Sequence, residues 1–154
     1  MATLLNDTDQ LAIVFEIGGR RRDRFTARLA FQHYAEPHNA FHTFAEARVE
    51  IHESDLRNFA THLREFGLAE DDLRNFRYEP GVEPSFDFEF GKTAQGELGP
   101  YVASAGVDMN RVLRMTQAVP FRENRLALRL RTTHARAQRF LAELLKETDA
   151  ALLV

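Results

Sequence analysis

Alternating apolar and polar residues recur along this sequence, and two such stretches lead directly into patterns typical of capped amphipathic helices. The stretches are 45–51 and 126–130, and the capping residues that follow them are Ser54 and Thr133. Alternation with period two is typical of strands with one buried face, because successive strand side chains point to opposite sides of a sheet. The pattern predicts an α+β fold of mainly antiparallel sheets with two amphipathic helices.

Further strands are expected on both sides of these stretches. The apolar run 11–17 stops at Gly18 and Gly19, which predicts a hairpin turn into the alternating stretch 25–31. The phenylalanines of 86–90 alternate with acids up to Gly91, which predicts a second hairpin with 101–107. An irregular strand is expected over 109–121.

Two helices are expected, one starting at Ser54 and ending at Gly67, the other starting at Thr133. Both carry apolar residues at helical spacing. The expected buried residues are Leu56, Phe59, Ala60, Leu63 and Phe66 in the first helix, and Ala137, Phe140, Leu141, Leu144 and Leu145 in the second. Between them, the proline-containing segment 68–84 is expected to be a connector with a short helical turn around 69–76.

The two halves of the sequence share one plan. Phe15 to Gly18 matches Phe88 to Gly91, and in each half a later strand runs into the helix. The match predicts an internal duplication of a strand-strand-strand-helix unit, with pseudo-repeats 11–67 and 86–148. Both repeats belong to a single expected domain, 1–154, a size typical of one hydrophobic core.

Composition excludes several kinds of chemistry and predicts a location. There is no cysteine, which excludes disulfides, thiolate nucleophiles and cysteine metal sites and fits a reducing compartment. The first residues lack the pattern of a signal peptide. No apolar run approaches the roughly 20 residues that a membrane-spanning helix needs. A cytoplasmic protein without a membrane span is therefore expected.

No motif predicts catalysis or a cofactor. His33, His38 and His42 lie near Glu36, but their spacing matches no recurrent zinc pattern, so no metal is expected. The sequence contains no Gly-x-Ser-x-Gly nucleophile elbow and no paired-histidine helix. No catalytic residue is therefore assigned.

A cluster of arginines is the feature of the sequence that most suggests nucleic-acid binding. Arg20 to Arg22 and Arg24 could contact phosphate, but the net charge is −3 and the sequence pI is near 6.1. The glycines around this cluster lie between expected strands, whereas a phosphate-binding loop leads into a helix. Nucleic-acid binding is therefore not expected.

Charge is unevenly distributed along the chain, and its middle is acidic. Residues 44–107 hold 13 acids against six bases, a net charge of −7, whereas residues 108–154 hold five acids against nine bases. Such a segment can form a surface that attracts a basic partner. The expected partner-binding residues are Glu70, Asp71, Asp72, Glu79, Glu83, Asp87 and Glu89.

The segments 45–66 and 126–145 resemble the corresponding parts of small bacterial immunity proteins of the WapI type. The resemblance rests on a strand leading into a capped helix, seen twice. It implies a non-enzymatic protein with a protein partner. Together with the acidic segment 44–107, it leads to the expectation of an immunity or antitoxin-like protein that blocks a cationic toxin by occlusion. Two alternatives remain: a small enzyme with a pocket near His33, His42 or His52, and a structural or assembly subunit that forms a homodimer.

Overall fold

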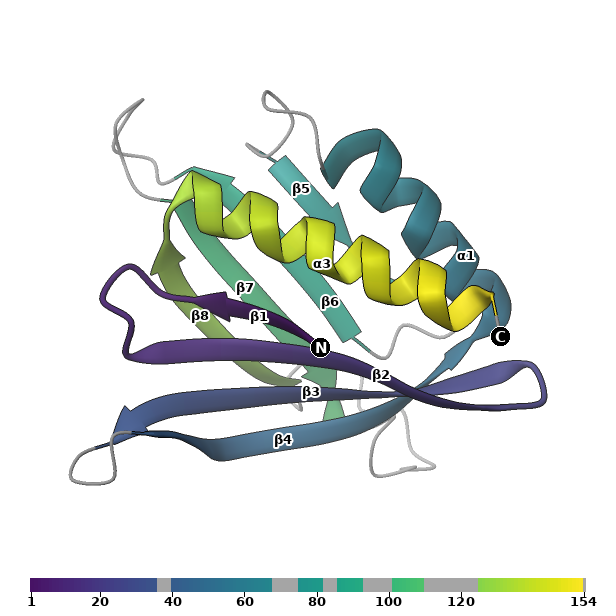
Figure 1. The fold of residues 1–154 in the computed structure, drawn as a ribbon, viewed down its shortest axis with the longest axis horizontal. Helices are drawn as coiled ribbons and strands as arrows, with labels where there is room; N and C mark the ends of the chain where they lie inside the picture. Colours follow the sequence, from purple (N-terminus) through teal and green to yellow (C-terminus); the bar gives the residue numbers. More distant parts are fainter. Residues whose placement is uncertain (36–39, 68–74, 82–85, 93–100, 110–124, 154) are drawn as a thin grey trace.

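A computed structural model describes residues 1–35, 40–67, 75–81, 86–92, 101–109 and 125–153, which form two four-stranded antiparallel sheets and two α-helices (Figure 1). Sheet A contains, in spatial order, β1 (Ala2–Leu5), β2 (Leu11–Arg21), β3 (Arg24–Ala35) and β4 (Ala40–His52). Sheet B contains β5 (Asn75–Tyr78), β6 (Phe86–Lys92), β7 (Tyr101–Asp108) and β8 (Arg125–Thr132). Helix α1 (Glu53–His62), continued by the π-helical turn η1 (Leu63–Gly67), follows sheet A, and α3 (His134–Leu152) follows sheet B. The predicted α+β fold with antiparallel sheets is confirmed.

Each half of the described chain is four strands followed by a helix, one strand more than the expected unit. Phe15 and Phe88, which match in sequence, lie on β2 and β6, the second strands of their sheets. The additional strands are β1 and β5. Each has four residues, too few for a period of two to stand out from chance, although Phe76 and Tyr78 of β5 are buried.

Parts of three expected segments lie outside the described residues. In the connector 68–84, residues 68–74 and 82–85 are not described, and the helical turn expected around 69–76 is wrong where it overlaps the start of β5. Strand β7 ends at Asp108, so the irregular strand expected over 109–121 is described only at Met109.

The predicted turn at Gly18 and Gly19 is wrong, because β2 continues through both glycines to Arg21. The chain reverses immediately after β2, at Arg22, whose φ is 58°. A Cβ atom on Gly18 would lie 2.6 Å from Oγ1 of Thr26 on the neighbouring strand. The first glycine thus permits close packing of two strands, a role that a sequence pattern does not distinguish from a turn.

The hydrophobic core lies between the two sheets and is shared by both. The ring of Phe15 on β2 lies 5.5 Å from that of Phe86 and 5.4 Å from that of Phe88, both on β6. Phe59 of α1 and Phe140 of α3 are fully buried in the same cluster. The predicted inward faces are confirmed for 25–31, 86–90 and the stripe of the second helix up to Leu144.

The two α-helices begin differently from one another. Thr133 caps α3 as predicted, its hydroxyl accepting a hydrogen bond of 3.2 Å from the backbone N–H of Arg136. Helix α1 is capped by His52, not by Ser54: the Nδ1 atom of His52 accepts from the backbone N–H of Ser54 at 3.1 Å. The other ring nitrogen of His52 lies 3.1 Å from Oδ2 of Asp23, which fixes the ring at the end of β4.

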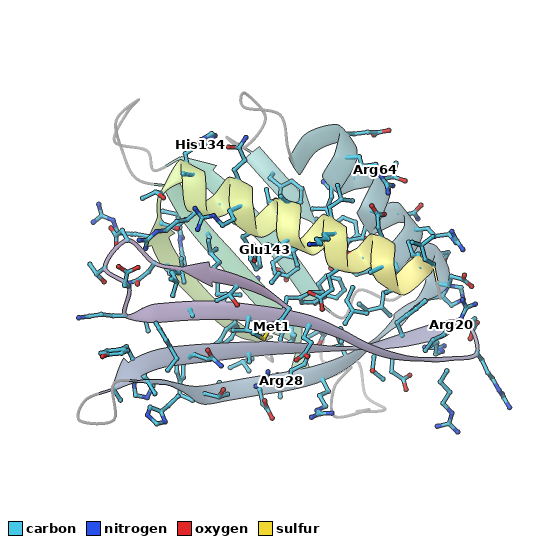
Figure 2. The ribbon with its side chains drawn as sticks, viewed as in Figure 1. Met1, Arg20, Arg28, Arg64, His134 and Glu143 are labelled. Carbon is cyan, nitrogen blue, oxygen red and sulfur yellow. The ribbon has the colours of Figure 1, made fainter. Side chains whose placement is uncertain are left out.

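Helix α3 lies between β1 and α1 and in front of sheet B (Figure 1). Its Glu143, labelled in Figure 2, accepts a hydrogen bond of 3.1 Å from the backbone N–H of Thr3 on β1. Glu147, one turn further along α3, accepts a hydrogen bond of 2.7 Å from the backbone N–H of Ile17. Ile17 is on β2, two residues beyond Phe15, which is opposite the first residue of β1. In the part of the chain that is described, no helix is both long and apolar enough to cross a membrane.

Candidate functional site

The outer face of sheet B brings together polar and charged side chains from all four of its strands. Its register places Arg77 opposite Glu89, Glu89 opposite Ser104, and Ser104 opposite Arg129. Directly opposite residues point to the same side of an antiparallel sheet, so these four side chains form a row across it. Their neighbours along each strand, such as Phe90 and Leu130, point to the core.

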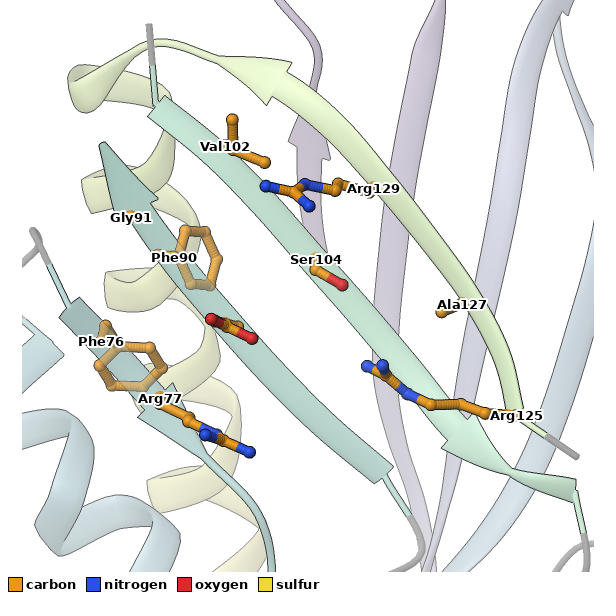
Figure 3. Close-up of a pocket in the computed structure, with 10 residues that line it drawn as sticks. Phe76, Arg77, Phe90, Gly91, Val102, Ser104, Arg125, Ala127 and Arg129 are labelled. Atoms are coloured by element: carbon orange, nitrogen blue, oxygen red, sulfur yellow. The ribbon is translucent and has the colours of Figure 1, made fainter. Parts of the chain in front are cut away.

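Small residues leave a hollow in this face (Figure 3). Gly91, Ser104 and Ala127 cannot fill the space between the longer side chains around them, and the hollow has a volume of about 600 Å³. It is lined by Phe76, Arg77, Glu89, Phe90, Gly91, Val102, Ser104, Arg125, Ala127 and Arg129. Its charged lining residues lie on the exposed side of the sheet, and the core residues Phe76 and Phe90 border it.

The charges around the hollow are of two kinds. Asp87 is bound by the guanidinium group of Arg125, which extends over Gly106 so closely that a Cβ atom there would clash with its Nε. Arg77, Glu89 and Arg129 are exposed and form no ion pair within the described residues. These three side chains can therefore meet the charges of another molecule without first breaking an ion pair.

Asp87 is the most perturbed acid of this face. Partial burial raises the pKa of its carboxyl group above the usual 3.8, Arg125 opposes this, and Glu79 and Glu89 add to the increase. Burial disfavours the charged carboxylate more than a single guanidinium favours it. Asp87 and Arg125 together fix one side of the hollow.

The structure places some of the predicted acidic residues on this face. Asp87 and Glu89 lie on it, and Glu79 is exposed just after β5. The other four, Glu70, Asp71, Asp72 and Glu83, lie outside the described residues. Sequence reasoning missed the arginines beside them. The alternation in 126–130 points Arg129 outward, but only the strand register brings it into line with Glu89.

The histidine cluster is only partly described. His33 and His42 are opposite each other on β3 and β4, with ring centroids 6.2 Å apart, whereas Glu36 and His38 lie outside the described residues. Among the residues that are described, no three or more His, Cys, Asp or Glu side chains are grouped so that they could hold a metal ion. The hollow on sheet B is not lined by His33, His42 or His52.

The arginine cluster at the turn between β2 and β3 is interleaved with acids. Arg20 pairs with Glu53 at 3.1 Å and Arg24 with Glu50 at 3.7 Å. A smaller hollow of about 280 Å³ at this turn is lined by Arg21, Arg22, Asp23, Arg24 and Glu50. Carboxylates within the cluster reduce the positive potential that a phosphate backbone would need.

A buried polar pair lies between α1 and sheet B. The Tyr78 hydroxyl donates a hydrogen bond of 2.9 Å to the backbone carbonyl of Asp55. Burial, and then the nearby charge of Asp55, raise the pKa of Tyr78 well above 10.0. A phenol that holds its proton this firmly serves as a hydrogen-bond donor in the core.

The two segments with a strand that leads into a helix, 45–66 and 126–145, occupy equivalent positions in the two halves. Residues 45–66 span the end of β4, α1 and most of η1, and residues 126–145 span β8 and the first half of α3. Both therefore join the last strand of a sheet to a helix that packs on the core. No family model, curated protein or solved structure matches this chain.

Proposed function

We propose that this chain is a non-enzymatic protein-binding domain and that the outer face of sheet B is its contact surface. The supporting observation is the row formed by Arg77, Glu89, Ser104 and Arg129 across the hollow. Three of these side chains are charged, exposed and without an ion pair within the described residues. A partner with complementary charges gains pairing there at little cost to the fold.

The form of the surface favours a macromolecular partner. Its charges of both signs lie on β5, β6 and β8, a spacing that matches several side chains of a protein rather than one small ligand. Such charges accelerate association and select the partner more than they deepen affinity. Glu79 and Glu89 would contact basic residues of the partner, and Arg77 and Arg129 would contact acidic ones.

The finer proposal is that the partner is a cationic toxin that the domain blocks by covering its active cleft. It is supported by the resemblance of 45–66 and 126–145 to immunity proteins and by the absence of a catalytic motif in the sequence. Glu79 and Glu89 supply negative charge for such a cleft, to which the acids of 70–72 and 83 would add.

The experiment compares two charge reversals with the same chemistry. Arg129→Glu changes the proposed surface, whereas Arg139→Glu changes an exposed arginine on α3 that also forms no ion pair within the described residues. Wild-type and variant chains are immobilised and incubated with soluble extract of the source cells, and captured proteins are quantified by mass spectrometry. A protein captured by wild type and Arg139→Glu, but at least ten-fold less by Arg129→Glu, supports the surface.

Two outcomes oppose the proposal. If wild type, Arg129→Glu and Arg139→Glu capture every protein equally, the outer face of sheet B is not the contact surface. If a captured protein is a toxin, its activity should fall with one equivalent of wild-type chain and persist with Arg129→Glu. Persistence with both would refute inhibition by occlusion.

A further inference from the structure

Each sheet has two edge strands, β1 and β4 in sheet A and β5 and β8 in sheet B. They differ in the features that prevent a strand of another molecule from pairing with them. Glu143 of α3 accepts the backbone N–H of Thr3 on β1, and Glu147 accepts that of Ile17 on β2, beside the start of β1. Strand β5 has only four residues. Strand β8 carries only cations among its outward charges, Arg125, Arg129 and Arg131. An exposed edge strand is a template for pairing unless such features block it.

Strand β4 lacks each of these features. It is 13 residues long and forms the outermost strand of sheet A (Figure 1), and within the described residues no strand pairs with its outer edge. It also carries two of the exposed large apolar side chains, Phe41 at 37% and Phe44 at 51% exposure. Long edge strands that expose aromatic side chains tend to be buried in an interface.

The charges of β4 are incompletely paired within the chain. Arg48 lies directly opposite Arg28 of β3, a like-charge pair that destabilises a sheet. Arg28 is bound by Glu46 at 2.7 Å and lies 3.8 Å from Glu16, whereas Arg48 forms no ion pair within the described residues. A carboxylate placed beside Arg48 from outside would offset this repulsion.

We propose that β4 pairs antiparallel with β4 of a second copy of this chain, about a two-fold axis at Ala47. This register places Arg48 opposite Glu46 of the second copy and, by symmetry, Glu46 opposite Arg48. The pairing of β4 with β3 shifts register at Phe44, so the regular part of the strand on both sides of the axis is 45–49. These residues pair with one another, and sheet A becomes continuous across the dimer.

Neighbouring registers are less favourable. An axis at Glu46 places that carboxylate opposite itself, and an axis at Arg48 places two guanidinium groups together and Glu46 opposite Glu50. Like charges directly opposite destabilise antiparallel pairs. Self-pairing of β8 brings together cations only, so the same charge argument that favours β4 opposes β8.

Charge reversals that complement each other test both the pairing and the register. Glu46→Arg and Arg48→Glu each place like charges opposite one another in the homodimer, and their mixture restores both opposite-charge contacts. Arg48→Glu also replaces the repulsion with Arg28 by attraction, so it should not weaken the fold. Sedimentation equilibrium across a concentration series measures self-association at low ionic strength.

Wild type should dimerise, each variant alone should associate at least ten-fold more weakly, and an equimolar mixture of the two should form a heterodimer. The matched control is Arg131→Glu on β8, which should dimerise as wild type does. A monomeric wild type at hundreds of micromolar, or variants that dimerise unchanged, would overturn the proposal. The proposed contact surface lies on sheet B, so this result leaves that proposal standing.

Discussion

Asp87, at the side of the hollow, is the acid with a raised pKa on the outer face of sheet B. Its carboxylate is bound by Arg125, yet burial still raises its pKa above 3.8. The native chain therefore takes up a proton at higher pH than the unfolded chain does. Stability from this group increases as the pH falls through the raised native pKa, and it is lost as the pH rises again.

Replacing Asp87 with asparagine should remove this dependence. The amide oxygen of Asp87→Asn still accepts a hydrogen bond from Arg125, and no charge is desolvated. We expect a free energy of unfolding at pH 7 equal to that of wild type or up to about 1 kcal/mol higher, a small effect because the site is partly exposed. Urea unfolding at several pH values should show the difference shrinking as the pH approaches 3.8.

The control is Glu89→Gln, which removes a carboxylate from an exposed position on the same strand. It should change stability little at any pH. If Asp87→Asn lost more than about 1 kcal/mol at pH 7, the attraction of Arg125 would outweigh the burial of the carboxylate.

At the scale of elements, α3 both covers the core and provides a hydrogen-bond acceptor to the edge of sheet A. Its Glu147 accepts the N–H of Ile17 with one oxygen, and the other lies 3.1 Å from the amino group of Met1. Strand β1 begins at Ala2, opposite Phe15, so β1 offers no partner for this N–H group. A helix side chain thus completes the hydrogen bonding at this edge of sheet A.

Truncating Glu147 should therefore cost more than neutralising it. Glu147→Ala leaves the N–H of Ile17 without its acceptor, which should lower the free energy of unfolding by about 1–3 kcal/mol. Glu147→Gln keeps an acceptor and should lose less. Hydrogen exchange should show faster exchange of the Ile17 amide in the alanine variant only. Equal losses for both variants would show that charge, not the hydrogen bond, matters there.

At the scale of the whole molecule, one core holds the two halves together. The ring of Phe15 from sheet A contacts Phe86 and Phe88 of sheet B and lies 6.4 Å from that of Phe59 on α1. The burial of each sheet therefore depends on the other. We expect residues 1–154 to unfold as a single cooperative unit.

Phe15→Ala should lower the free energy of unfolding by about 3–5 kcal/mol, because it empties a large buried site between the sheets. The control Leu153→Ala removes a side chain that is 88% exposed and should change stability little. Far-ultraviolet circular dichroism and aromatic near-ultraviolet signals should follow one coincident transition in each chain. Two separate transitions would show that the halves fold independently.

The sequence predicted elements better than their ends. Alternation identified the inward faces of β3 and β6, and helical spacing identified the stripe of α3, because those patterns span several residues each. It missed β1 and β5, whose four residues show too little of the pattern. Gly18 was misread because close packing against Thr26 and a turn both require glycine. His52, not Ser54, caps α1 because β4 continues to that residue.

By itself, the sequence determined which residues turn toward a core, since period and polarity are local properties of the chain. The tertiary structure alone decided which outward residues meet. Strand register aligns Arg77, Glu89, Ser104 and Arg129, which come from four separate strands. In sheet A, the pairing of β3 with β4 likewise places Arg48 opposite Arg28. Register depends on contacts between distant segments, and the alternation within one strand does not specify them.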